Sequence, residues 1–516
     1  MRGSVLGSVT TAAAIGLLGT LAQAAGPSSA HLARGTQGVF WFMHISDLHT
    51  SCEWNPTDEM KNQEFALGEA VQVIKPWFVV ATGDLVDASP GGIPTMGQSQ
   101  AEWDQYKQSY TNAGMTPDFY FDLPGNHDGY GDIDFPHYLA NSLQGSTNHD
   151  TYVSWSVDTP VGSYLFFGLD SAGVGSGPIS ENPQFLPGQI SAMQDGLAQN
   201  PDAQLVFVLA HHRISQPANS SQVIDVLKGL GGGFYIHGHV HEYDEYTDGD
   251  PGIVVNEVNS LGQTEANNVA VGVVDHNAFV YRATGSKDPW PMVMITAPVS
   301  TTLRNGEANP YAYAVCKDRT DNPVRALVFG AGDTTAVRLQ IGTLPVVAMN
   351  SAGQPPNLWA ADVDTTALPA GPQKVTVSAT VDGKEGSHTI TAQFVDGPCD
   401  ALPQDPPVDP GTDGGVEGGD DSGGAGGSAG GESDSGTAGA SGGGAAGSGG
   451  GPSAGGQSGA AGADAGLQPS DPPAVADGGG CACRAAGPAS WAGWWPAAAI
   501  AAAFGAARRS RRNRAR

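Results

Sequence analysis

The chain has 516 residues, with 52 acidic side chains against 23 Lys and Arg, and a formal net charge of −29 at pH 7. That length is enough for two or three domains. Because so negative a surface repels phosphate backbones, we expect no nonspecific binding to nucleic acid.

The first segment, residues 1–24, predicts a signal for export. Arg2 precedes an apolar stretch, and the segment ends in the small-x-small sequence AQA at 22–24. This pattern is typical of a cleaved secretory signal peptide. We therefore expect the mature protein to lie outside the cytoplasm.

Apolar runs alternate with segments of helical periodicity from residue 38 onward. Strands are expected within 38–47, 76–84, 118–128, 164–170, 203–212 and 233–241, and helices within 62–75, 101–114, 188–200 and 220–230. This alternation predicts a layered α/β architecture. Ligand sites in such sheets lie at the carboxyl ends of the strands.

Polar residues follow five of these apolar runs. In chain order they are Asp47 and His49, Asp84, Asn126 and His127, His211 and His212, and His239 and His241. Each group alone is a weak signal, because an Asp at a strand end is more often a cap or turn residue. A buried His is also more often a core residue. Chance explains the ordered set of five groups poorly.

The chemistry of this set indicates a metal site. Mixed carboxylate, amide and imidazole ligands suit divalent or trivalent ions such as Mn, Fe or Zn. The absence of thiolates from the set argues against a structural zinc site. There are more ligands than one ion needs, so a pair of ions sharing a carboxylate is expected.

The pattern DxH–GD–GNHD–H–GHxH over residues 40–250 resembles that of the calcineurin-like metallophosphoesterases. The resemblance implies a four-layer α/β/β/α sandwich, for which we expect the bounds 38–300. It also implies a two-metal centre. The implied ligands are Asp47, His49 and His241 for the first ion, Asn126, His211 and His239 for the second, and Asp84 as the bridge.

The same resemblance places His127 outside the metals, near the leaving-group oxygen. Purple acid phosphatases have a metal-binding Tyr where this chain has Asp87, so no tyrosinate ligand is expected. Asp87 resembles the partner of the catalytic His in the calcineurin branch, and Asp128 is the alternative. A carboxylate there would raise the pKa of His127 and let it act as an acid.

Two further residues near the motifs have open roles. His237 lies outside the motif and is expected to support the site. Arg213 follows the fourth motif, where many relatives have Pro. It either clamps a substrate phosphate as a bidentate donor or is a surface arginine on a loop.

The pattern changes in the second half of the chain. Segments 269–285 and 290–298 are expected as strands that close the catalytic sandwich. Residues 319–397 contain short alternating runs separated by turn residues, which predicts a small all-β, Ig-like sandwich. A phosphoesterase head followed by such a sandwich is similar to the extracytoplasmic part of certain eukaryotic multi-pass membrane proteins.

The cysteines of the body fit an exported chain, in which disulfides are permitted. Cys316 and Cys399 flank the late β-rich region and could pair, whereas Cys52 is expected to stay free.

The end of the chain predicts a linker and an anchor. Residues 401–480 contain no Lys, Arg or aromatic residue, so they cannot bury a core and are expected to be a disordered linker. Residues 481–516 resemble a myxobacterial C-terminal sorting signal. They carry Cys481 and Cys483, the apolar stretch 491–507 and an arginine cluster. The resemblance implies processing near one cysteine and display at the cell surface, with a CxC zinc site as the alternative.

The combined reading predicts an exported phosphoester hydrolase with two metal ions and a metal-bridging hydroxide as nucleophile. The alternative is a noncatalytic surface binding or scaffold protein that keeps the fold. Scaffold relatives typically lose metal ligands or the catalytic His, and this chain keeps them all. The motifs do not separate monoester from diester substrates.

Overall fold

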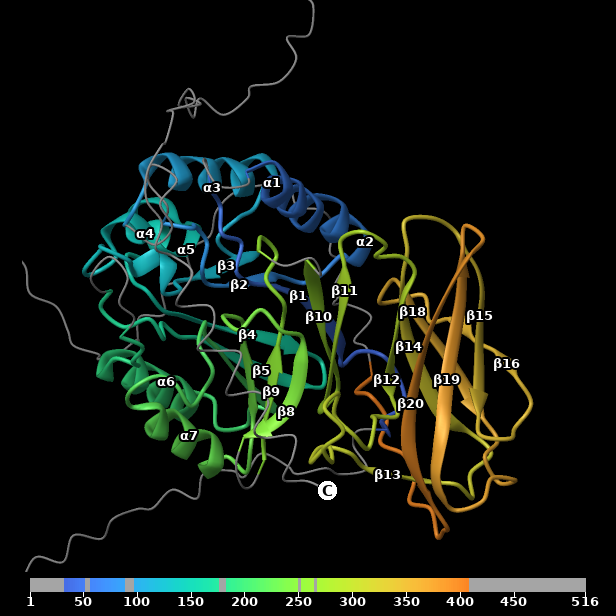
Figure 1. Ribbon diagram of the computed structural model, residues 1–516. Helices are drawn as coiled ribbons and strands as arrows, with labels where there is room; N and C mark the ends of the chain where they lie inside the picture. The colour runs from blue at the N-terminus through green and yellow to red at the C-terminus, as the bar shows by residue number, and fades with distance from the viewer. Residues whose placement is uncertain are drawn as a thin grey trace, which may run out of the picture. The chain divides into compact units, whose positions relative to one another are not determined.

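The computed structural model describes residues 32–51, 56–88, 97–175, 182–248, 252–263 and 267–407 (Figure 1). The expected signal segment, Cys52, most of the expected linker and the whole C-terminal segment 481–516 lie outside these residues. Among the described helices, none has the length and apolar character needed to cross a membrane.

The first sheet has the strand order β11-β10-β1-β2-β3. Its strands are β1 (Val39–Ile45), β2 (Val79–Thr82), β3 (Tyr120–Leu123), β10 (Asn268–Asp275) and β11 (Ala278–Gly285). β1, β2 and β3 are parallel, whereas β10 and β11 are antiparallel additions. The helices of this half are α1 (Pro56–Glu64), η2 (Phe65–Ala70), α2 (Val71–Ile74), α3 (Gln100–Asn112), η4 (His127–Gly129), α4 (Pro136–Asn141) and α5 (Leu143–Asn148).

The second sheet has the order β4-β5-β6-β7-β9-β8. Its strands are β4 (Val153–Thr159), β5 (Gly162–Gly168), β6 (Leu205–Leu209), β7 (Phe234–His237), β8 (Asp244–Asp248) and β9 (Ile253–Glu257). β5, β6, β7 and β9 are parallel neighbours. Its helices are α6 (Pro187–Gln199) and α7 (Ser220–Gly229).

Apolar side chains from both sheets form a shared core. Phe42 of β1 packs edge-on against Phe166 of β5, with ring centroids 5.5 Å apart, and Phe166 stacks on Phe207 of β6 at 4.6 Å. Separate clusters join the first sheet to α2 and α3, and the second sheet to α6 and α7. The predicted α/β class is therefore confirmed, with mixed sheets.

The rest of the described chain is built from β-strands in two further sheets. One has the order β12-β14-β18-β17, with β12 (Met292–Ala297), β14 (Asn322–Phe329), β17 (Asn350–Ser351) and β18 (Leu358–Val363). The other has the order β13-β20-β19-β15-β16, with β13 (Ala314–Cys316), β15 (Thr334–Ile341), β16 (Val347–Ala348), β19 (Gly371–Val381) and β20 (Lys384–Val395). The Ig-like assignment of this region stays a prediction.

The sequence predicted that β12 would help to close the α/β sandwich, but β12 joins neither the first sheet nor the second. It pairs with β14, with Met292 opposite Phe329. The reason is that both of its faces are apolar. Met294 packs into the core beside the first sheet, whereas Ile295 packs into the core of the β region.

The predicted pairing of Cys316 with Cys399 is confirmed by a disulfide between them. It joins β13 to the segment that follows β20.

Candidate metal centre

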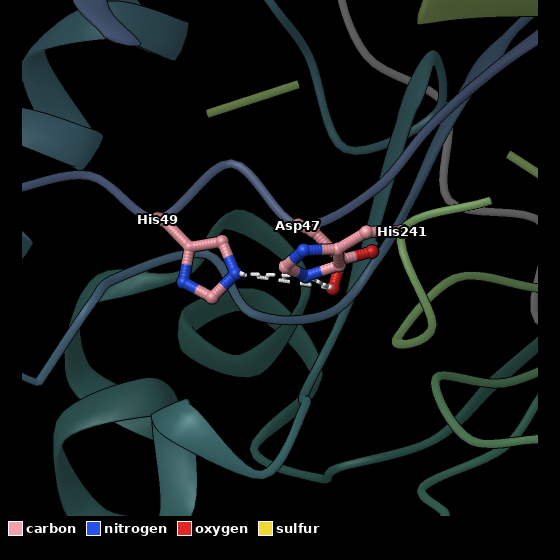
Figure 2. Close-up of side chains that lie close together, drawn as sticks. All are labelled: Asp47, His49 and His241. Atoms are coloured by element: carbon pink, nitrogen blue, oxygen red, sulfur yellow. Dashed lines mark hydrogen bonds and ion pairs between the residues drawn. The ribbon is translucent and has the colours of Figure 1, made fainter. Parts of the chain in front are cut away.

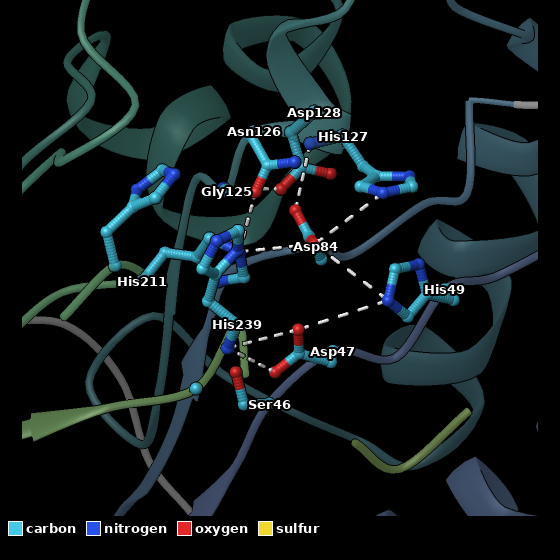
Figure 3. A network of polar contacts seen from close by, with 12 residues as sticks. Ser46, Asp47, His49, Asp84, Gly125, Asn126, His127, Asp128, His211 and His239 are labelled. Carbon is cyan, nitrogen blue, oxygen red and sulfur yellow. Dashed lines mark hydrogen bonds and ion pairs between the residues drawn. The ribbon is translucent and has the colours of Figure 1, made fainter. Parts of the chain in front are cut away.

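The residues that follow the strands of both sheets converge on one place (Figure 3). Three groups each bring three ligand atoms within 4.8 Å of one another: Asp47, His49 and His241; Asp84, His211 and His239; and His49, Asp87 and His127. The residues of the first two groups follow β1 and β2 of the first sheet or β6 and β7 of the second, and in both sheets they lie at the carboxyl ends of parallel strands.

The first group is centred on the Asp47 carboxylate, to which both imidazoles point (Figure 2). His241 Nε2 lies 3.1 Å from Asp47 Oδ1, and His49 Nε2 lies 3.9 Å from the same oxygen. The two ring nitrogens face each other at 3.3 Å.

The second group is centred on His211. Its Nε2 lies 2.9 Å from Asn126 Oδ1, 3.1 Å from Asp84 Oδ2 and 3.2 Å from His239 Nδ1. Asp84 Oδ2 also lies 3.8 Å from His49 Nε2 of the first group. Asp84 thus lies between the two groups, where a bridging carboxylate would have to be.

The donor set fits metal ions. Two neutral imidazole nitrogens that face each other repel unless a proton or a cation lies between them, and each of the first two groups contains such a pair. The set mixes imidazole nitrogens with carboxylate and amide oxygens, a combination that suits Mn, Fe or Zn. The residues expected for the two ions are therefore brought together with suitable chemistry.

The charges within the site also favour a cation. Burial raises the pKa of the Asp84 carboxyl, but the charge of His211 and the other neighbouring imidazoles outweigh burial and hold it well below its usual value. Burial lowers the pKa of His211, but Asp84 outweighs it and raises that pKa to about 10. The ionised carboxylates therefore favour the binding of a cation in this buried site.

His127 faces the same centre from the neighbouring loop. Its Nε2 lies 4.0 Å from Asp84 Oδ2. Its Nδ1 lies 2.9 Å from the backbone oxygen of Asp87, which can only accept, so Nδ1 carries a hydrogen and donates.

The Asp87 carboxylate binds a different histidine from the one expected. It lies 3.1 Å from Nδ1 of His49 and accepts from Gln263 Nε2 at 2.8 Å, whereas it is 3.8 Å from Nδ1 of His127. The expected orientation of His127 by this carboxylate is therefore replaced by a bond to the backbone carbonyl. The carboxylate instead contacts His49, one of the expected metal ligands.

Asp128 does not orient His127 either. Its carboxylate accepts hydrogen bonds from the backbone N–H groups of Leu85, Val86 and Gly125, at 3.0, 3.1 and 2.7 Å. The alternative role expected for Asp128 is therefore wrong, because its oxygens hold together the loops after β2 and β3.

The backbone of the ligand loops is unusual. Asp47, His49, Asp84, His239 and His241 all have φ between 47° and 69°. This left-handed region disfavours residues that carry a Cβ, and such strain gathers at functional sites. Tight packing holds these turns in place.

Two motif glycines allow the loops to come this close. A Cβ on Gly125 would overlap the backbone nitrogen of Asp84, and one on Gly238 would overlap Ser46 and the Asp47 carboxylate. The glycine in each motif is therefore required by close approach between loops.

Sequence reasoning missed three residues that support the ligands. Gln263 donates to Asp87, as described above. Tyr130 accepts from Asn126 Nδ2 at 2.7 Å, which turns the amide oxygen of Asn126 toward His211. Ser260 donates to the backbone oxygen of Asp47 at 2.8 Å. They belong to no motif, and only the tertiary structure brings them to the site.

The two residues with open roles share one neighbour. His237 Nε2 lies 3.8 Å and Arg213 Nη2 lies 3.5 Å from Oε2 of Glu257. His237 is buried beside the ligand loop, in agreement with a supporting role. The Arg213 side chain is 39% exposed, so the guanidinium can face solvent while it contacts Glu257.

Comparison with known proteins agrees with this geometry. Residues 40–243 match the family model of the calcineurin-like phosphoesterases. The chain therefore contains a calcineurin-like metallophosphoesterase domain.

Relatives extend this metallophosphoesterase likeness. Transmembrane protein 62 of Mus musculus is 24% identical over 331 residues, which cover 61% of this chain and 50% of the mouse protein. An Arabidopsis thaliana protein named for the metallophosphoesterases is 30% identical over 151 residues, or 27% of this chain and 20% of that protein. The chain thus spans at most half of either relative.

Among solved structures, GAP50, the anchor in the inner membrane complex of Plasmodium, has a TM-score of 0.35 at 14% identity, covering 49% of this chain and 86% of that chain. An archaeal phosphodiesterase has a TM-score of 0.24 at 12% identity, covering 48% of this chain and 99% of that chain. Scores this low carry no argument about activity.

Proposed function

We propose that the protein is an exported phosphoester hydrolase that works with two metal ions. The observation that carries the proposal is the position of Asp84, which lies between the two ligand groups and within 4.0 Å of His127. A pair of bound ions and one histidine would then face the same substrate phosphate.

The chain supplies the ligands in two sets. Asp47, His49 and His241 would hold one ion, Asn126, His211 and His239 the other, and Asp84 both. Ions bound in this way lower the pKa of water, supply a nucleophile at neutral pH and stabilise charge on the phosphoryl oxygens. The chain keeps these side chains fixed through outer contacts, such as that of Asp87 with His49.

His127 would assist the leaving group. Because its Nδ1 is held on the Asp87 carbonyl, its Nε2 is the atom left to carry a proton toward the leaving oxygen. Asp84 Oδ2 lies 4.0 Å from that nitrogen.

The wider organisation is proposed from the sequence. The domain would form a four-layer sandwich, followed by an Ig-like sandwich, a disordered linker and a C-terminal membrane anchor at the cell surface. The clusters between helices and sheets support the layering. The disulfide suits an exported chain. Substrates would be phosphoesters other than nucleic acid backbones.

The test is turnover of a panel of phosphomonoesters and phosphodiesters by purified protein loaded with Mn, Fe or Zn. Asp84→Asn should abolish turnover and lower the bound metal content. Asp225→Asn, an exposed acid on α7, is the matched control and should change neither. Metal-loaded, folded protein that turns over nothing in the panel would favour the scaffold alternative.

A further inference from the structure

A cavity of about 360 Å³ lies away from the candidate metal centre, where β8, β9 and β11 meet the β region. Its walls include Glu245, Asn256, Arg282, Arg304 and His388. None of the candidate metal ligands lines it. Its size is within the range of about 300–1,000 Å³ that is typical of small-molecule sites.

Two arginines line this cavity, the exposed Arg304 and the partly buried Arg282, and among the described residues neither forms an ion pair with a carboxylate. Arg304 donates from Nε to the backbone oxygen of Tyr243 at 3.0 Å, and its guanidinium lies 4.1 Å from the centre of the Tyr243 ring. Among the described residues, the terminal nitrogens of Arg304 have no hydrogen-bond partner. Arg282 donates to the backbone oxygens of Val293 and Ser387.

Arg282 and Arg304 line the same cavity. The pKa of Arg282 is lowered first by burial and further by the positive charge of Arg304. Two positive side chains that line one cavity, with no ion pair to a carboxylate among the described residues, favour an anionic ligand.

Two neutral donors line the same cavity. Asn256 is 1% exposed, and in the part of the chain that the structure describes its Nδ2 has no hydrogen-bond partner. His388 accepts the backbone N–H of Ile295 at Nδ1, so its hydrogen lies on Nε2. Burial lowers the pKa of His388 to about 3, with a further contribution from Arg282, so the ring is a neutral donor at ordinary pH.

Glu245 is the one carboxyl group in the described wall of the cavity. Burial raises the pKa of its side chain to about 7, against a lowering effect of Arg304. When ionised it opposes an anion, and when protonated it adds another donor. The described wall thus carries several hydrogen-bond donors and two positive arginines, and Glu245 is its single acidic group.

We propose that this cavity is a second binding site, which takes a small ligand with a phosphate or carboxylate group between Arg282 and Arg304. The planar guanidinium fork matches both groups with paired, charge-assisted hydrogen bonds. Asn256 and His388 supply further donors from β9 and β20. This site goes beyond the proposed hydrolase activity and does not depend on it.

The test is a calorimetric titration of the full-length, metal-loaded protein with inorganic phosphate and, separately, with succinate. At least one anion should bind saturably within the millimolar range. Arg304→Gln should weaken that binding about tenfold or more, since hydrogen bonds to a charged group are lost. Arg338→Gln, which removes an exposed arginine on β15, should leave it unchanged.

A second comparison separates this site from the metal centre. In an Asp84→Asn background, binding that depends on Arg304 should persist. Binding of phosphate alone would identify a phosphate ligand, and binding of succinate alone a carboxylate ligand. No saturable binding of either anion, or equal affinity in the parent and Arg304→Gln proteins, would overturn the proposal.

Two conservative substitutions provide further tests that change the structure less. Arg304→Lys keeps the charge but loses the fork, and should weaken binding less than Arg304→Gln does. Glu245→Gln removes the opposing charge and should tighten binding several-fold. Weaker binding in folded Glu245→Gln protein would contradict an anionic ligand.

Discussion

Asp87 serves two histidines through two different oxygens. Its carboxylate holds Nδ1 of His49, and its backbone carbonyl holds Nδ1 of His127. The first contact orients a candidate metal ligand, whereas the second leaves Nε2 of His127 facing Asp84. The side chain and the backbone of one residue therefore act on different parts of the site and can be tested separately.

Removing the His127 ring should affect poor leaving groups most. We expect His127→Ala to keep both metals and to lose about 10²–10⁴-fold in kcat/KM on alkyl phosphoesters, because general acid catalysis contributes that much. Nitrophenyl esters need little protonation and should lose less. Kinetics on both ester types and metal analysis of the same samples test this, and equal losses on both would show that His127 is not the acid.

Removing the Asp87 carboxylate should act on the metals instead. We expect Asp87→Asn to weaken metal binding about 10–100-fold, the usual effect of losing a residue that orients a ligating His. The backbone carbonyl remains, so the difference between alkyl and nitrophenyl substrates should be preserved. Metal titration monitored by activity measures this. Unchanged metal affinity would mean that the contact with His49 has no such role.

At the scale of elements, the site depends on short turns that follow parallel strands. The loop after β7 passes so close to the loop after β1 that Gly238 has no room for a side chain beside Ser46. The left-handed residues Asp47 and His239 lie on these same two loops. The ligand positions are thus set by contact between loops, which the strands alone do not determine.

Gly238→Ala should therefore destabilise the fold. We expect a loss of about 1–3 kcal/mol in the free energy of unfolding, because inserted atoms force packed groups apart. The matched control is Gly229→Ala at the end of α7, where a Cβ would meet nothing within 4 Å. Denaturant unfolding of both variants measures the free energy of unfolding. A Gly238→Ala protein as stable as the parent would contradict the expectation.

At the scale of the whole described unit, a buried ion pair joins the catalytic sheets to the β region. Arg325 of β14 donates from Nε and Nη2 to the Asp275 carboxylate of β10, at 2.8 and 2.9 Å. His276 lies between two carboxylates, 2.8 Å from Asp275 and 2.7 Å from Asp405. Breaking such a buried pair by removing one partner typically costs about 3–5 kcal/mol.

His276 should make stability depend on pH. Burial lowers its pKa, but the bonds to Asp275 and Asp405 outweigh burial and raise it to about 9 from an ordinary value of 6.5. A raised pKa in the folded state gives stability that is fully present below pH 6.5 and lost as pH rises through 9. We expect a decrease in the free energy of unfolding on the order of 3 kcal/mol over that window.

Unfolding measured between pH 6 and 10 checks this, with His276→Gln expected to flatten the decrease. His149→Gln, at an exposed histidine, is the control and should keep the slope of the parent. An equal slope in the His276→Gln protein would exclude His276 as the source.

The class of the fold and the candidate ligands could be predicted from the order of apolar runs and polar motifs along the chain. Asp47 and Asp84 follow neighbouring parallel strands of the first sheet and His211 follows a strand of the second, so local pattern was enough to place each at the carboxyl end of a strand. The sequence also suggested that Cys316 and Cys399 could form a disulfide, because they flank the β-rich segment that the disulfide closes.

The hydrogen-bond partners of the site residues could be found only in the tertiary structure. Asp87 and Asp128 stand at suitable spacing for His127, yet one carboxylate binds His49 and the other binds backbone N–H groups. β12 reads as a strand of the catalytic sheets but pairs with β14, because its two apolar faces fit two cores. Hydrogen bonds and packing between distant segments depend on loop paths and sheet order, which spacing along the chain does not encode.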